Sequence, residues 1–200
     1  GPLVANKMNR HPVQLANAAA TLQSISGGRA MLGMGSGAAP GSRNSGEQLA
    51  IGTSLHDAEG RRRRLIDTIG AVRALWSGVD SFESEFFTLE GIGKVVGAED
   101  IPPIVVGAGS ASMVELSVEH ADGVNILGGI ERRPLIEHAV SLRPRPSFDI
   151  SVHVPADLSH PQGGDIEALT QLGVDGRILA VTAPFDHRAI ESLGSHLLSG

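Results

Sequence analysis

The sequence of 200 residues contains no cysteine. This excludes disulfides, thiolate nucleophiles, iron–sulfur clusters and cysteine-bound zinc, so any metal would have to be bound by histidine and carboxylates. The eight histidines show neither the His-x-x-x-His nor the His-Glu-x-x-His spacing of a helical metal site. We therefore predict no metal centre, and any redox chemistry would need a bound organic cofactor.

Aromatic residues and lysines are also scarce. Aromatic side chains make up 3% of the chain, with one tryptophan and no tyrosine, which leaves few platforms for stacking bases or sugars. Only Lys7 and Lys94 are lysines among the 16 basic residues, and the net charge is -6. A general nucleic-acid or anionic-membrane surface is therefore not expected.

Long apolar runs are missing as well. No stretch approaches the roughly 20 apolar residues that span a bilayer, and no secretory leader pattern opens the chain. The sequence therefore predicts a cytoplasmic protein. With 41% apolar and 19% charged residues, the chain is expected to fold as one globular domain over residues 1–200.

Helix-like and strand-like segments alternate along the chain. The spacing of apolar residues predicts extended segments at 1–8, 30–34, 104–107, 123–127, 148–154 and 177–182, and helices at 12–25, 57–76, 112–120, 134–142, 166–172 and 186–198. A small hairpin is predicted at 82–89, and the glycine-rich stretch 36–56 is predicted to be a long functional loop.

This alternation indicates an α/β fold with a parallel sheet, whose functional loops follow the carboxyl ends of the strands. A doubly wound open sheet and a (β/α)₈ barrel both fit. A barrel of about 250 residues uses about 30 per unit. The chain has room for about six such units, so a TIM-type barrel would be incomplete.

Several motifs occur in a fixed order: Asn9-Arg10-His11-Pro12, Ser26-Gly27-Gly28-Arg29, Leu32-Gly33-Met34-Gly35-Ser36-Gly37, Leu75-Trp76-Ser77-Gly78, Pro102-Pro103-Ile104-Val105-Val106-Gly107-Ala108-Gly109 and Ala121-Asp122-Gly123-Val124-Asn125. In this order the chain resembles the bacterial luciferase-like family of flavin- and coenzyme F420-dependent oxidoreductases. The resemblance covers residues 9–125 well and 165–193 more loosely. It implies a TIM-type barrel that holds FMN or F420 at the carboxyl ends of its strands. It also implies further βα units before residue 1, so we expect an N-terminally shortened barrel.

The segment Gly107-Ala108-Gly109-Ser110 lies between a β-branched strand and a helix. Its backbone N–H groups and the helix N-terminus could bind a phosphate, although a tight turn alone would also need glycine. The resemblance places the cofactor phosphate here. It also implies that Gly35, Ser36 and Gly37 let the backbone approach the ring and its phosphoryl side chain, and that Asn125 faces the cofactor.

Two residues are candidates for catalysis. His11 stands at a strand end, where it could touch cofactor or substrate or could simply begin a helix. Some F420 enzymes of the family carry a glutamate directly after the glycine segment, where this chain has Ala38-Ala39, so Glu47 is the nearest acid. Asp122 is expected to be structural. Arginines 61–64 are expected to form a solvated, locally paired helix face, with contact to a phosphate or an F420 glutamate tail as the alternative.

Together these observations predict an oxidoreductase that uses F420 or FMN for hydride transfer or monooxygenation of a small organic substrate. A noncatalytic module for cofactor binding or assembly, which pairs its open sheet edge with another chain, is the alternative. A homodimer is expected in both cases. The resemblance further implies that the segment 2–4 could carry a non-prolyl cis peptide beside the ring.

Overall fold

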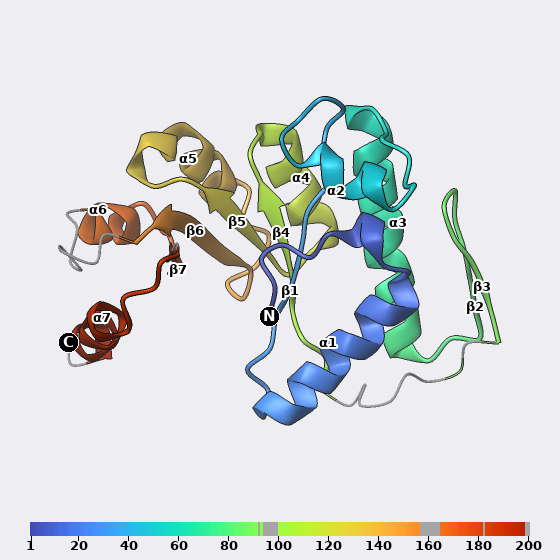
Figure 1. The fold of residues 1–200 in the computed structure, drawn as a ribbon, viewed down its shortest axis with the longest axis horizontal. Helices are drawn as coiled ribbons and strands as arrows, with labels where there is room; N and C mark the ends of the chain where they lie inside the picture. Colours follow the sequence, from blue (N-terminus) through green and yellow to red (C-terminus); the bar gives the residue numbers. More distant parts are fainter. Residues whose placement is uncertain (92, 94–99, 157–164, 182, 199–200) are drawn as a thin grey trace.

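A computed structural model describes residues 1–200 apart from 92, 94–99, 157–164, 182 and 199–200. Its centre is a curled parallel sheet whose strand order is β1-β4-β5-β6-β7 (Figure 1). The strands are β1 (Leu32–Met34), β4 (Ile104–Ala108), β5 (Gly123–Leu127), β6 (Asp149–Pro155) and β7 (Gly176–Ala180). The order follows the chain without the reversal that defines a doubly wound sheet. The sheet is therefore part of a TIM-type barrel, as predicted.

The N-terminal segment lies along the free edge of β1. Ala5 pairs in parallel with Met34, and the Ala5 N–H donates to the Gly33 carbonyl over 2.7 Å. The predicted extended segment 1–8 ends there, because Lys7–Asn9 form a short 3-10 helix, η1. Counting this segment, six extended units lie side by side, which agrees with the predicted number of βα units.

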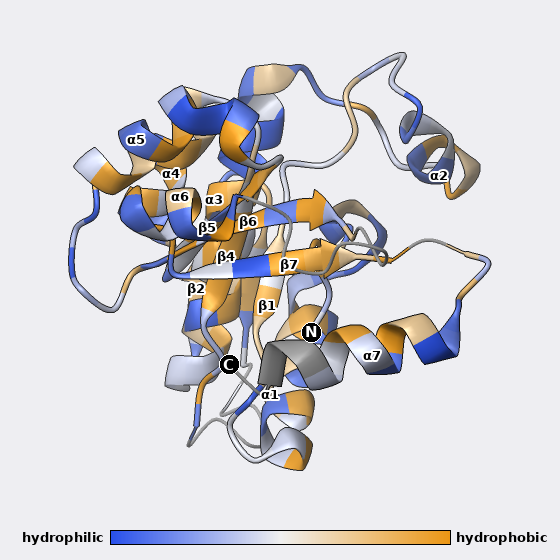
Figure 2. Ribbon diagram, turned by 90° about the vertical axis from the view of Figure 1, so that its left-hand side faces the viewer, coloured by the Kyte–Doolittle hydropathy of each residue, from blue (hydrophilic) through white to orange (hydrophobic). Residues whose placement is uncertain are grey.

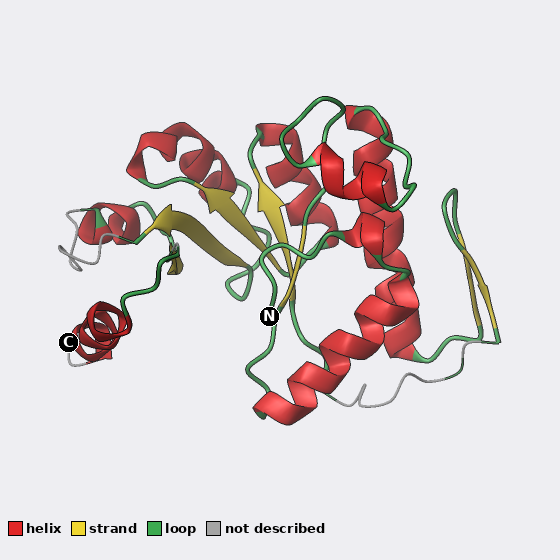
Figure 3. Ribbon diagram, viewed as in Figure 1, coloured by secondary structure: helices red, strands yellow, loops and turns green. Residues whose placement is uncertain are grey.

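Helices cover the outer face of the sheet (Figure 3). They are α1 (Pro12–Ser26), α3 (Ala58–Ser77), α4 (Ala111–His120), α5 (Arg133–Ser141) and α6 (Ile166–Gln171), while α7 (His187–Leu198) follows β7. Figure 2 shows apolar residues along the central strands β4 and β5. The outward-facing side chains of these strands, such as Val106 and Ile126, are buried in one hydrophobic core, and α4 packs against both strands. The opposite, inner face of the sheet is left for smaller and more polar residues.

The ends of the two longest helices follow local chemistry. His11 caps α1 through its ring nitrogen, and Gly27 ends that helix with φ +63°. Asp57 caps α3, which ends at Gly78 with φ +71°. These residues explain why the predicted bounds 12–25 and 57–76 agree with the structure within one or two residues.

The predicted hairpin consists of β2 (Ser81–Glu83) and β3 (Thr88–Glu90), which pair antiparallel. The prediction of a continuous loop at 36–56 was wrong, since α2 (Ser45–Ala50) lies within it. Only Gln48 of this helix is buried, so no apolar spacing marks it. The Gln48 side chain accepts a hydrogen bond from the Ala38 N–H over 2.7 Å and thereby folds the segment back on itself.

Two aspartates close the amino-terminal edge of the sheet in the same way. The Asp122 carboxylate, just before β5, accepts from the Ile104 N–H over 3.0 Å and from Arg73 and Arg145 over 3.0 Å each. Asp175, just before β7, accepts from the Ile150 N–H over 2.8 Å. Each carboxylate therefore joins the start of its own strand to an N–H in the first two residues of a neighbouring strand, which agrees with the structural role predicted for Asp122.

Replacing Asp122 by alanine is expected to lower the free energy of unfolding by about 1–3 kcal/mol, because the Ile104 N–H loses its acceptor. The two arginines are largely exposed, so their ion pairs contribute little. Asp122→Asn keeps an acceptor oxygen and should lose less than half as much. Urea titration checks both variants, and equal losses for the two would contradict the assigned role of the backbone bond.

Candidate functional site

The inner face of the sheet carries small and polar residues at mid-height. Gly107, Asn125 and Ser151 are register partners on β4, β5 and β6, so they lie in one row across three strands. Asn125 is 3% and Ser151 5% exposed. This row forms a flat surface with a single amide group, against which a planar ligand could lie.

Val4 borders this surface. A Cβ built on Gly35 would lie 2.8 Å from Val4 Cγ2, and one built on Gly107 would lie 2.9 Å from Val4 Cγ1. Both positions therefore need glycine because the Val4 side chain lies against them. The prediction that small residues at Gly35 leave room for a ligand is thus modified, since Val4 takes up that room and would itself contact the ligand. The Leu3–Val4 peptide is cis.

The other two residues of the glycine segment have different settings. Gly37 adopts φ +88°, which side-chain-bearing residues rarely adopt. A Cβ there would also lie 3.0 Å from Met8 Cγ. Ser36 is half-buried beside it. The glycine segment follows β1. Because β1 and β4 are parallel, it lies at the carboxyl ends of the strands, as does the turn after β4.

The turn after β4 presents an open helix N-terminus. Ser110 is the N-cap of α4, but its side chain makes no capping hydrogen bond and lies 3.1 Å from the Ser112 hydroxyl. Gly109, Ser110, Ala111 and Ser112 are all exposed. The first N–H groups of α4 are thus accessible to an anion, whereas those of α1 and α3 are capped by side chains.

The turn after β5 differs from the turn after β4 because a carboxylate of the same turn already occupies its backbone N–H group. The Gly129 N–H donates to the Glu131 carboxylate over 2.8 Å, and this hydrogen bond lowers the pKa of Glu131. Arg132 follows on the 3-10 helix η2 (Ile130–Arg132) and donates to the Gly109 carbonyl over 2.7 Å. A guanidinium group therefore stands beside the open end of α4. Sequence reasoning missed Arg132, and its position after a glycine pair was the available signal.

The two candidate catalytic residues make structural contacts. His11 Nδ1 accepts from the Val13 N–H over 3.3 Å, and its ring packs edge-on against Phe87. Glu47, on α2, accepts from the side-chain amides of Asn6, over 3.0 Å, and Asn9. These contacts fasten α2 to the chain that leaves the N-terminal strand. A catalytic role for either residue stays a prediction.

Lys7, Arg61 and Arg64 form a basic cluster. Lys7 is 2% exposed, and Met8 Sδ at 3.3 Å is the partner of its amine among the described residues. Burial, and then the charges of Arg64 and Arg61, lower the pKa of Lys7 from 10.5 to about 7. Arg64 also lies over the rings of Phe86 and Phe87.

The prediction of a solvated, paired face holds for only two of the four arginines. Arg62 pairs with Glu59, and Arg63 pairs with Glu85 over 2.9 Å. Arg61 instead donates to the His56 carbonyl over 3.1 Å. The sequence could not show that Arg61 and Arg64 at the start of α3 would lie near the buried Lys7.

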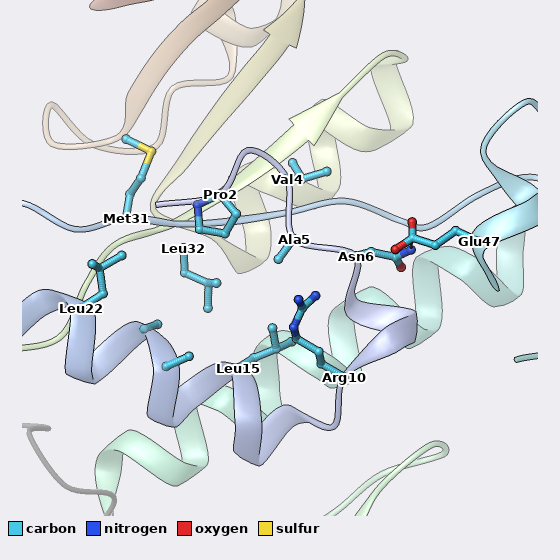
Figure 4. Close-up of a pocket in the computed structure, with 12 residues that line it drawn as sticks. Pro2, Val4, Ala5, Asn6, Arg10, Leu15, Leu22, Met31, Leu32 and Glu47 are labelled. Atoms are coloured by element: carbon cyan, nitrogen blue, oxygen red, sulfur yellow. Dashed lines mark hydrogen bonds between the residues drawn. The ribbon is translucent and has the colours of Figure 1, made fainter. Parts of the chain in front are cut away.

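A groove of about 450 Å³ runs between the N-terminal segment and α1 (Figure 4). Leu15, Leu22 and Leu32 form part of its apolar wall, while Arg10 and Glu47 stand at one end. In the described part of the chain, no group of three or more potential metal ligands occurs. No described helix is long and apolar enough to cross a membrane.

Comparisons with known proteins concern the family and the fold of the chain. Residues 1–143 match the model of the luciferase-like monooxygenase family. The 5,10-methylenetetrahydromethanopterin reductase of Archaeoglobus fulgidus is 32% identical over 127 residues, which cover 63% of this chain and 35% of the reductase. The chain spans about a third of the length of the curated relatives it matches.

Two solved structures show the same fold. An F420-dependent secondary alcohol dehydrogenase in complex with an F420–acetone adduct has a TM-score of 0.74 at 14% identity, covering 94% of this chain and 75% of its own. The oxygenating constituent of 3,6-diketocamphane monooxygenase from Pseudomonas putida, in complex with FMN, has a TM-score of 0.51 at 18% identity, covering 76% and 47%. At these identities the likeness concerns the fold.

Proposed function

The chain belongs to the luciferase-like monooxygenase family, and from this premise we propose that it is an oxidoreductase that binds F420 or FMN. The cofactor lies at the carboxyl ends of β1, β4 and β5, and the substrate is a small organic molecule. Relatives of the chain include F420-dependent dehydrogenases. The open N-terminus of α4 with Arg132 beside it is the observation that carries the proposal.

The residues present fit such a cofactor. Both FMN and F420 combine a flat ring system with a phosphate-bearing side chain. The first N–H groups of α4 and the Arg132 guanidinium suit the phosphate. The row Gly107, Asn125 and Ser151 suits the ring, with Val4 as an apolar contact beside it. When bound, either cofactor supplies hydride chemistry, while these residues bind and orient it.

The test is a fluorescence titration with F420, FMN and riboflavin, which has the ring of FMN without its phosphate. We expect F420 or FMN to bind with micromolar affinity, and riboflavin to bind at least tenfold more weakly than FMN. Binding of neither F420 nor FMN at tens of micromolar would overturn the proposal.

Arg132→Met is expected to weaken binding of the phosphate-bearing cofactor about tenfold, which corresponds to about 1.4 kcal/mol. Riboflavin should be affected little, because it lacks the phosphate. Arg133→Met is the matched control, since Arg133 pairs with Glu137 over 3.2 Å on the exposed side of α5. If the two variants bind the cofactor equally well, Arg132 does not contact the phosphate.

The alternative is a noncatalytic module that assembles through its sheet edge. The groove between the N-terminal segment and α1 favours it, because this groove lies beside the sheet edge where Ala5 forms an isolated bridge to Met34. Such a module would show no hydride transfer to any acceptor. A protein that binds neither F420 nor FMN but self-associates in sedimentation would support this alternative over the oxidoreductase.

A further inference from the structure

The row on the inner face contains a hydrogen bond between two buried side chains. Asn125 Nδ2 donates to Ser151 Oγ over 2.9 Å. The two residues are direct register partners on the parallel strands β5 and β6. Because both are almost fully buried, the orientation of the Asn125 amide depends on which group Ser151 uses as its own acceptor.

The Val124 carbonyl supplies that acceptor. Val124 precedes Asn125 on β5, and Ser151 Oγ donates to its oxygen over 3.5 Å. A hydroxyl has one proton, so a Ser151 that donates to this carbonyl can only accept from Asn125. The Asn125 amide must then turn its Nδ2 group toward Ser151.

The consequence concerns the other end of the amide. With Nδ2 held by Ser151, Asn125 Oδ1 is left as an acceptor, and no hydrogen bond from another described residue reaches it. On the same row, Gly107 has no side chain that could cover this oxygen. The inner face therefore offers one fixed acceptor in the middle of an otherwise small-residue surface.

We propose that Ser151 is a positioning residue that holds the Asn125 amide with Oδ1 toward the barrel interior, where it accepts a hydrogen bond from the imide N–H of the cofactor ring. The inference rests on the proposed function. FMN and F420 share this imide group, so the contact recognises the ring chemistry common to both. A buried acceptor also disfavours ligands that present an acceptor or a methyl group there.

The probe is FMN together with its N3-methyl derivative, in which a methyl group replaces the imide proton, or the matching pair of F420 compounds if only F420 binds. For the wild-type chain, we expect methylation to weaken binding at least tenfold in a fluorescence titration. In Asn125→Ala and Ser151→Ala this ratio should fall to about twofold. Ser151→Thr keeps the hydroxyl and should keep the ratio.

The matched control is Ser141→Ala on α5, whose hydroxyl donates to the His138 carbonyl over 2.7 Å on the outer side of the barrel. This variant should keep the wild-type ratio.

The outcomes separate the two proposals. If the wild-type chain binds neither FMN nor F420, both the proposed function and this inference are wrong. If it binds but Ser151→Ala and Asn125→Ala keep the full penalty for methylation, or if the wild-type chain shows no penalty, the inference alone is wrong. If Ser151 had a purely structural role, Ser151→Ala would weaken binding of the parent and the methylated ligand equally. The ratio of the two affinities would then stay at its wild-type value.

Discussion

Lys7→Met is expected to raise the free energy of unfolding at pH 7 by about 2–4 kcal/mol, because methionine fills a similar volume without a charge. Lys7 is buried next to a thioether and near two arginines. Lowering its pKa from 10.5 to about 7 corresponds to at most about 5 kcal/mol. Burial of Lys7 lowers the free energy of unfolding by this amount at every pH at which Lys7 is protonated in the unfolded chain but not in the folded one.

The sign of the pH dependence follows. Between pH 7 and 10.5 the unfolded chain binds a proton at Lys7 that the folded chain has largely released, so the stability of the wild-type protein rises with pH. Below pH 7 both states hold the proton and the cost is constant. The chain has no cysteine and no tyrosine that would titrate in the same range, and Lys94 and the terminal amine are common to the wild-type protein and the Lys7→Met variant.

Urea titrations from pH 6 to pH 10.5 measure this effect. Lys7→Met should remove most of the rise in stability, so the two proteins converge toward high pH. Arg43→Met is the control, because Arg43 is an exposed cation, and it should reproduce the wild-type curve. A Lys7→Met protein that is less stable than wild type at pH 7 would show that the lysine is stabilised by a group outside these contacts.

Gly107→Ala is expected to lower the free energy of unfolding by about 1–3 kcal/mol, because the added methyl group meets Val4 in a packed site. The new Cβ would lie 2.9 Å from Val4 Cγ1, and the β-branched valine has little freedom to turn away. The same collision would shift the edge of the row that carries Asn125. We therefore also expect cofactor affinity to fall at least tenfold.

Val4→Ala should restore much of the stability of Gly107→Ala, since it removes the atom that collides. A double-mutant cycle followed by thermal unfolding measures this coupling. Gly109→Ala is the control, because a Cβ there meets nothing within 4 Å, and it should change stability by less than about 0.5 kcal/mol. Equal losses at Gly107 and Gly109, with no rescue by Val4→Ala, would contradict the assigned contact.

Sequence reasoning predicted most of the fold because the chain's elements are marked locally. The β-branched run at β4 and the glycine that ends α3 at Gly78 are visible without tertiary information. Helix α2 is not, since it holds its place through Gln48 and the Ala38 N–H rather than through an apolar face. The order of the strands also could not be read from alternation, which fits two architectures equally well.

The candidate site could be predicted from the sequence only where it consists of main-chain groups. The glycine turn before α4 could be read from the sequence, because glycine between a strand and a helix has a local meaning. Arg132, Val4 and Ser151 could not, since each contacts a residue far from it in the sequence: Arg132 contacts Gly109, Val4 lies against Gly107, and Ser151 accepts from Asn125. Such pairs depend on register, which alternation does not fix.

The aspartates that join the strand starts have a consequence for how this scaffold diversifies. Asp122 and Asp175 secure one rim of the barrel through backbone bonds to neighbouring strands, while the turns that would meet a ligand project from the opposite rim. Mutations that change ligand specificity at one rim therefore leave the aspartate hydrogen bonds at the other rim intact. Such a division of labour lets new specificities arise without eroding the framework that supports them.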